Sequence, residues 1–188
     1  WFAANALPSS VMAALSNDAV LRDCRLLDAF LERSVDLGDG QRPSQTDLMA
    51  IVRHESGLGV IAIEAKVDET FGPTVAEWLA DPKGDLPTRT ARLDRLCGML
   101  GLDPATAGSL RYQLIHRTAS AIIEAKRYHA HDAVMLVQSF CPRRSWFDDF
   151  SAFATALGFP PHQVGTVSAP KVRDDVALRV GWVAEPND

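Results

Sequence analysis

Two neighbouring runs of branched apolar residues constrain the fold of this chain more than any other feature. Residues 47–52 and 58–67 are rich in Ile, Val and Leu, and a short polar turn at 54–57 separates them. Apolar runs on either side of such a turn are typical of an antiparallel hairpin. Apolar and polar residues also alternate over 30–37, before a Gly-Asp-Gly turn at 38–40. The sequence therefore predicts a three-stranded antiparallel meander.

Helical spacing of apolar residues dominates the remainder of the chain. It predicts helices at 11–15, 20–27, 75–79, 90–100, 109–128 and 145–157. Two further strands are predicted at 132–140 and 176–183, and the apolar run 133–137 is typical of a strand covered on both faces. The order predicts one α/β domain over residues 1–188, a mixed sheet flanked by helices.

Composition excludes several classes of protein. The apolar stretches, such as 58–63, are far shorter than the roughly 20 residues that cross a bilayer. Cys24, Cys97 and Cys141 show no CxxC spacing and no secretory signal precedes them, so we expect reduced thiols in a cytoplasmic protein. The net charge of −5 gives no general basic footprint for nucleic acid, although a local basic patch stays open. A chain that begins at Trp1 is compatible with the loss of an N-terminal segment.

The predicted strand at 58–67 carries a charged pair on one face. Alternation places Glu64 and Lys66 on the same side of this strand. Asp47 lies opposite Glu64 if the hairpin turns at 55–56, and opposite Lys66 if the turn is centred one residue later. Both registers bring the three side chains to one face, about 5 Å apart across the strands. A slip of one residue would separate them.

Two carboxylates and a lysine in this arrangement suit phosphoryl chemistry. Mg²⁺ takes oxygen ligands, commonly one or two carboxylates completed by waters and phosphate. Such an ion polarises a phosphoryl oxygen and activates water, while a lysine can orient that water. The other interpretation is an exposed Glu–Lys pair on a solvated sheet face, and the isolated pattern does not separate the two. Asp68 and Glu69 are a second acidic pair, and Glu69, three residues after Lys66, either precedes the turn at 71–72 or takes a catalytic role.

These residues resemble the PD-(D/E)XK nuclease superfamily. Its motif is an acid that opens one strand, followed by (D/E)xK on the next, and here Asp47 is followed by Glu64-Ala65-Lys66. The core order of the superfamily, αβββαβ in a restriction-endonuclease-like fold, is similar to the order predicted above. Thr46 stands where the motif has its proline. The resemblance implies that Asp47 and Glu64 bind metal and that Lys66 takes part in catalysis.

The long predicted helix adds candidate residues. Gln113 and Arg117 resemble a QxxxR signature that some superfamily members carry on the core helix, and their spacing places them on one helix face. Gln113 is then a catalytic candidate, and Arg117, His116 and Tyr112 are substrate-binding candidates, with helix packing as the alternative for His116. Glu32 is a candidate third metal ligand, with a plain surface role as its alternative.

Residues 63–72 and 110–118 are also similar to a bacterial family of uncharacterised nuclease-like proteins, and this likeness covers about 31–140. It implies a nuclease dependent on Mg²⁺ or Mn²⁺ that hydrolyses phosphodiester bonds, with DNA expected ahead of RNA. A homodimer is compatible with this class. The alternative is a nuclease-fold module without catalysis that binds nucleic acid or a protein partner.

Overall fold

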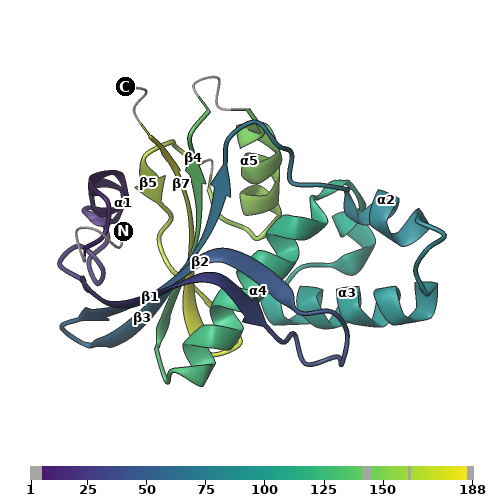
Figure 1. Ribbon diagram of the computed structural model, residues 1–188, viewed down its shortest axis with the longest axis horizontal. Coiled ribbons are helices and arrows are strands. Elements are labelled where there is room, and N and C mark those ends of the chain that lie inside the picture. The colour runs from purple at the N-terminus through teal and green to yellow at the C-terminus, as the bar shows by residue number, and fades with distance from the viewer. Residues whose placement is uncertain (1–5, 142–144, 161, 186–188) are drawn as a thin grey trace.

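A mixed sheet of seven strands runs through the centre of the computed structural model (Figure 1). The structure describes residues 6–141, 145–160 and 162–185. The strands are β1 (Arg25–Val35), β2 (Ser44–His54), β3 (Gly57–Lys66), β4 (Asp132–Ser139), β5 (Thr166–Val167), β6 (Lys171–Arg173) and β7 (Val176–Ala184). The helices are α1 (Ser9–Leu15), α2 (Val75–Ala80), α3 (Leu86–Leu100), the 3-10 helix η1 (Pro104–Ser109), α4 (Tyr112–Arg127) and α5 (Phe147–Ala156). This architecture confirms the predicted α/β class.

The strand order is β1-β2-β3-β4-β7-β5, and β6 also pairs with β7. The first three strands form the predicted antiparallel meander, and β3, β4 and β7 are parallel to one another. His54 pairs with Gly57 and Leu48 pairs with Ile63. The hairpin therefore adopts the first of the two registers considered, and this register directs Asp47 toward Glu64.

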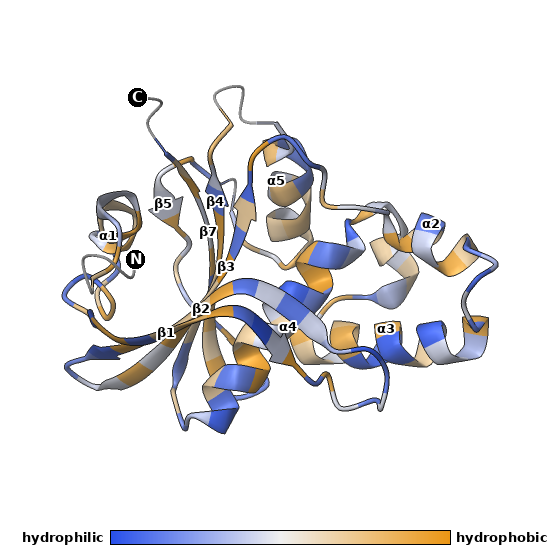
Figure 2. Cartoon of the chain, viewed as in Figure 1, coloured by the Kyte–Doolittle hydropathy of each residue, from blue (hydrophilic) through white to orange (hydrophobic). Residues whose placement is uncertain are grey.

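Different helices pack on the two faces of the sheet. Met49 of β2 and Val60 of β3 belong to the larger core, which α3, α4 and α5 cover, whereas Ala50 and Ile61 face the smaller core under α1. All residues of β4 are buried, as predicted for a strand covered on both faces. Figure 2 shows hydrophilic and apolar residues interleaved along α3 and α4, as expected of helices that bury one side.

The N-terminal region corrects one prediction. Residues 20–27 do not form a helix, because turns occupy 19–23 and β1 begins at Arg25. The Asp18 carboxylate accepts hydrogen bonds from the backbone N–H groups of Val20 and Leu21, at 3.0 and 2.9 Å. Such local side-chain bonds favour a turn over a helix.

The start of α2 lies against the start of α4. Val75 N–H donates to the Leu110 carbonyl at 2.8 Å, and Tyr112 N–H donates to the Pro73 carbonyl at 3.2 Å. The Thr74 and Glu77 side chains complete a capping box at the first turn of α2. These contacts fix the position of α2 beside the N-terminal turn of α4.

Among the described residues, no helix is long and apolar enough to cross a membrane.

Candidate active site

Glu64 and Lys66, at the end of β3, form a buried ion pair. Only 2% of Glu64 and 3% of Lys66 is exposed, and Lys66 Nζ lies 2.7 Å from Glu64 Oε1. The interpretation of this pair as a solvated surface feature is therefore wrong. Glu69 Oε1 is 3.8 Å from Lys66 Nζ, but Glu69 is exposed and its carboxylate also accepts turn N–H groups. A buried ion pair must gain further hydrogen bonds to offset the loss of hydration.

Helix α4 supplies those hydrogen bonds. Gln113 Nε2 donates to Glu64 Oε1 at 2.6 Å, and Arg117 Nε donates to Glu64 Oε2 at 2.7 Å. Lys66 Nζ donates to Gln113 Oε1 at 3.3 Å. The structure thus brings together the ExK pair and the QxxxR pair, which lie on elements about 50 residues apart in the chain. We call Glu64, Lys66, Gln113 and Arg117 the site cluster.

Ser44 extends this cluster and was not identified from the sequence. Arg117 Nη1 donates to Ser44 Oγ at 2.9 Å, and Ser44 Oγ lies 2.9 Å from His116 Nδ1. Burial, with the neighbouring Arg117 and Arg92 guanidinium groups, lowers the pKa of His116 to about 3. A neutral imidazole accepts at one ring nitrogen. Ser44 can therefore accept from Arg117 while it donates to His116.

Asp47 lies at the border between the site cluster and solvent. It is partly buried, and its Oδ2 accepts the Ala65 N–H at 2.8 Å. Burial and the nearby Glu64 carboxylate raise the pKa of Asp47, against the opposing effects of the Ala65 N–H, Arg117 and Lys66. Two carboxylates that repel each other in this way form a place where a bound cation would be favourable.

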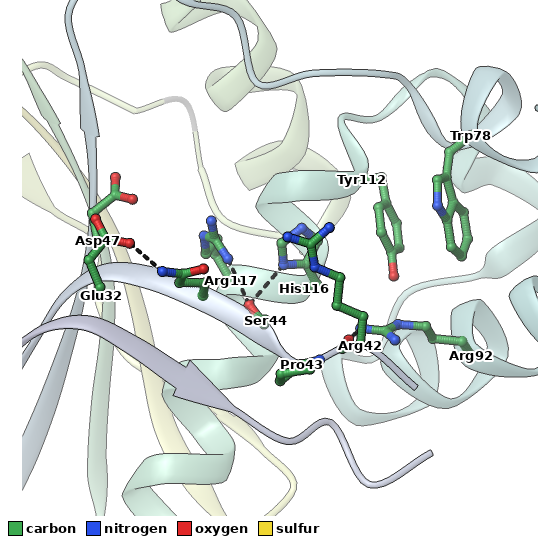
Figure 3. A pocket seen from close by; sticks show the side chains of 11 residues that line it. Glu32, Arg42, Pro43, Ser44, Asp47, Trp78, Arg92, Tyr112, His116 and Arg117 are labelled. Carbon is green, nitrogen blue, oxygen red and sulfur yellow. Dashed lines mark hydrogen bonds between the residues drawn. The ribbon is translucent and has the colours of Figure 1, made fainter. Parts of the chain in front are cut away.

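Glu32 of β1 lies opposite Asp47 of β2. The flanking pairs, Leu31 with Leu48 and Arg33 with Thr46, place it there. Its backbone φ is 51°, a left-handed conformation that costs a non-glycine residue about 1–3 kcal/mol and is often found at functional sites. Gln45 Nε2 donates to Glu32 Oε2 at 2.6 Å. Figure 3 shows Glu32 and Asp47 side by side at one end of a pocket.

This pocket has a volume of about 420 Å³. The residues that line it are Glu32, Arg42, Pro43, Ser44, Gln45, Asp47, Trp78, Arg92, Tyr112, His116 and Arg117. Trp78 of α2 stacks on Tyr112 of α4, with ring centroids 3.8 Å apart and planes 8° apart. All three predicted substrate-binding residues, Arg117, His116 and Tyr112, face the pocket, whereas Arg42, Arg92 and Trp78 were not identified from the sequence.

The donor atoms fit a divalent cation through two residues and not three. Among the described residues, no group of three or more His, Cys, Asp or Glu side chains is arranged to hold a metal ion. Asp47, Glu64 and Glu32 thus do not form a ready-made three-acid site. Asp47 and Glu64 match the usual Mg²⁺ pattern of one or two carboxylates. Glu64 already accepts three of the roughly four hydrogen bonds open to a carboxylate, so Asp47 is the freer ligand.

The fold and the site define an α/β protein whose mixed sheet carries a buried cluster of opposite charges beside an open pocket. The chain belongs to the family described as Domain of unknown function (DUF6946), whose model matches residues 1–187. Comparison with curated proteins gave no match, and comparison with solved structures gave none.

Proposed function

We propose that this protein is a metal-dependent nuclease of the PD-(D/E)XK type, which hydrolyses phosphodiester bonds in DNA ahead of RNA. One observation carries the proposal. Asp47, Glu64 and Lys66 occupy adjacent positions on two paired strands, and Gln113 of α4 contacts both Glu64 and Lys66. The superfamily that the sequence resembles has the acid and the (D/E)xK pair on these strands, and some of its members add a glutamine on the core helix. A purely structural ion pair would not require Asp47 at the border of a pocket.

Each residue of the site has a proposed role. Asp47 and Glu64 would hold Mg²⁺ or Mn²⁺, an ion that polarises a phosphoryl oxygen and lowers the pKa of a bound water. Lys66, fixed between Glu64 and Gln113, would orient the attacking water and offset negative charge on the phosphate. Gln113 holds the lysine, and Arg117 keeps Glu64 in position while it faces the pocket.

A second candidate function is a module with this fold that binds nucleic acid or protein without catalysis. The internal balance of the site cluster favours it. Lys66 and Arg117 match the charges of Glu64 and Asp47, and Glu64 is already bonded to three donors. A cluster that is complete in itself could serve to hold α4 on the sheet.

Cleavage assays separate the two functions. Single-stranded DNA, duplex DNA and RNA would be incubated with the protein and Mg²⁺ or Mn²⁺. Lys66→Met is the test variant, and Lys126→Met is its matched control because Lys126 lies in an exposed pair with Asp174. We expect the Lys66 variant to lose about 10²-fold or more in rate, as when an electrostatic donor is removed from other active sites, and the control to keep its rate. Equal cleavage by all three proteins, or none by the wild type, would contradict the proposal.

A further inference from the structure

The proposed chemistry leaves one end of the pocket unused. Asp47 and Glu32 lie at the acidic end, and Arg42, Arg92 and Trp78 lie away from them, as Figure 3 shows. In a chain of net charge −5, two arginines at one end of a pocket mark a local anion-binding region. We call this the arginine end of the pocket.

Arg42 is the cation of this region that is available to a ligand. It is exposed, it lines the pocket, and among the described residues its side chain has no hydrogen bond or ion pair. Figure 3 shows its guanidinium group directed into the pocket over His116. Arg92 is held in place, because Nη1 lies 3.3 Å from Asp39 Oδ2 and Nη2 donates to the Arg42 carbonyl at 2.9 Å. Arg92 thus positions the segment that carries Arg42.

Arg92 is committed to partners of this chain. Burial raises the pKa of Tyr112, and the charge of Arg92 and its hydrogen bond with the Tyr112 hydroxyl oppose that effect. Arg92 also bonds to Asp39 and to the Arg42 carbonyl. At this end of the pocket, Arg42 is therefore the arginine that can turn to an anionic ligand.

The pocket is walled at this end. The Trp78 ring is stacked on Tyr112, and the Arg89 guanidinium lies 5.3 Å from the Trp78 ring centroid. These contacts occupy the ring of Trp78, so it forms a fixed wall and not a platform on which a base would stack. A volume of about 420 Å³ is in the range of roughly 300–1,000 Å³ that holds small ligands. A duplex is wider than its own major groove of about 12 Å, so it could lie across the mouth of such a pocket but could not fit inside it.

We propose that the pocket takes the end of a single nucleic-acid strand and that Arg42 binds the terminal phosphate of that strand. The inference rests on the proposed function, because it places the first internucleotide phosphate toward Asp47 and Lys66. A terminal phosphate monoester carries a charge of about −1.5 to −2 near neutral pH, more than a diester, and therefore gains more from Arg42. The wall at Trp78 is the reason that the strand ends there.

Binding without metal tests the inference independently of cleavage. The probes are fluorescently labelled oligothymidylates with a 5′-phosphate, a 3′-phosphate or neither, measured by anisotropy with EDTA present. We expect one phosphorylated probe to bind at least about tenfold more tightly than the unphosphorylated probe, as for a charge-assisted hydrogen bond. The favoured probe identifies which end of the strand enters. An unlabelled duplex should compete poorly.

Arg42→Gln and Arg22→Gln form the matched pair of variants. Arg22 is a well-exposed arginine with 62% of its side chain accessible, and it does not line the pocket. The Arg42 variant should lose the preference for phosphate and the Arg22 variant should keep it. Equal binding of all probes, an unchanged preference in Arg42→Gln, or equal competition by duplex would overturn the inference. If the wild type prefers a phosphorylated probe but cleaves nothing, the phosphate subsite is upheld and the nuclease is rejected. If cleavage depends on Lys66 but no probe is preferred, the nuclease is upheld and the phosphate subsite is rejected.

Discussion

Two buried groups of charged side chains lie on opposite faces of the sheet, and only one of them borders the pocket. The site cluster lies under α4. On the α1 face, Arg179 of β7 bonds to Asp18 through Nε and to Asp132 through Nη1, and His54 Nε2 lies 3.3 Å from Asp132 Oδ2. All four of these residues are less than 10% exposed. We call them the anchor cluster.

The anchor cluster joins the turn after α1 to three strands, and none of its members lines the pocket. The site cluster has Arg117 in the pocket wall and Asp47 beside it, with a carboxylate whose ionisation the fold disfavours. Burial of charge alone therefore does not distinguish a catalytic group from a structural one. Access from a pocket, together with a carboxyl group whose pKa is raised at Asp47 and lowered at Asp18, makes the distinction.

The largest expected effect on stability is at the anchor cluster. Arg179→Met should lower the free energy of unfolding by about 3–5 kcal/mol, because it leaves Asp18 and Asp132 buried without a partner. Urea unfolding measures the change. The double variant Arg179→Met with Asp18→Asn should recover part of the loss. If the single variant is as stable as the wild type, the anchor cluster does not hold the N-terminal segment.

A smaller loss is expected at the site cluster. In Glu64→Gln the single amide oxygen can accept either from Arg117 or from Lys66 and Gln113, but not from both sides, and the amide NH₂ group then faces another donor. The balancing charge is also lost. We expect a decrease of about 1–3 kcal/mol in the free energy of unfolding, together with loss of cleavage. Urea unfolding and the cleavage assay on the same preparation give both numbers. If Glu64→Gln is destabilised but still cleaves at the wild-type rate, the site cluster has a structural role only, like the anchor cluster.

The pH dependence of stability should reflect His116. Its pKa falls from 6.5 in the unfolded chain to about 3 in the fold, so the unfolded chain binds the proton more tightly below pH 6.5. Its contribution to stability is complete above pH 6.5 and is lost as the pH falls toward 3, by at most about 1.4 kcal/mol per pH unit. His116→Asn should have a flatter profile than the wild type between pH 6.5 and 5. Parallel profiles would show that this imidazole is not held neutral.

The smallest expected effect on stability has the opposite sign. Burial and Glu64 raise the folded-state pKa of Asp47 above 3.8, so the fold loses stability as the pH rises through that pKa. Asp47→Asn should therefore be slightly more stable than the wild type at pH 7, and the gain should disappear below pH 3.8. The Asn Oδ1 atom can still accept the Ala65 N–H. Thermal unfolding at the two pH values tests this, and a destabilised variant at pH 7 would contradict the assignment.

Much of the site could be predicted because its residues follow regular periods. The two-residue period of strands placed Glu64 and Lys66 on one face, and the helical period did the same for Gln113 and Arg117. The register of the hairpin stayed open in the sequence. The structure resolves it through the pairing of His54 with Gly57.

The remainder depends on contacts that leave no local pattern. Ser44 lies 73 positions from Arg117 in the chain, and its hydroxyl becomes part of the site only when α4 packs on the sheet. Trp78 meets Tyr112 because the starts of α2 and α4 are bonded together. The short strands β5 and β6, of two and three residues, are too short to show an alternation. The prediction of a helix at 20–27 was wrong because the Asp18 side chain stabilises a turn there. The spacing of apolar residues does not show when a turn is more stable than a helix.

Calorimetric titration with Mn²⁺ tests the central claim most directly. The wild type, Asp47→Asn and Asp18→Asn would be compared at pH 7, since the last variant removes one carboxylate from the anchor cluster and none from the site. We predict that Mn²⁺ binds the wild type and Asp18→Asn at one site and does not bind Asp47→Asn. Binding that is the same in all three proteins, or absent from the wild type, would contradict a metal-dependent active site at Asp47.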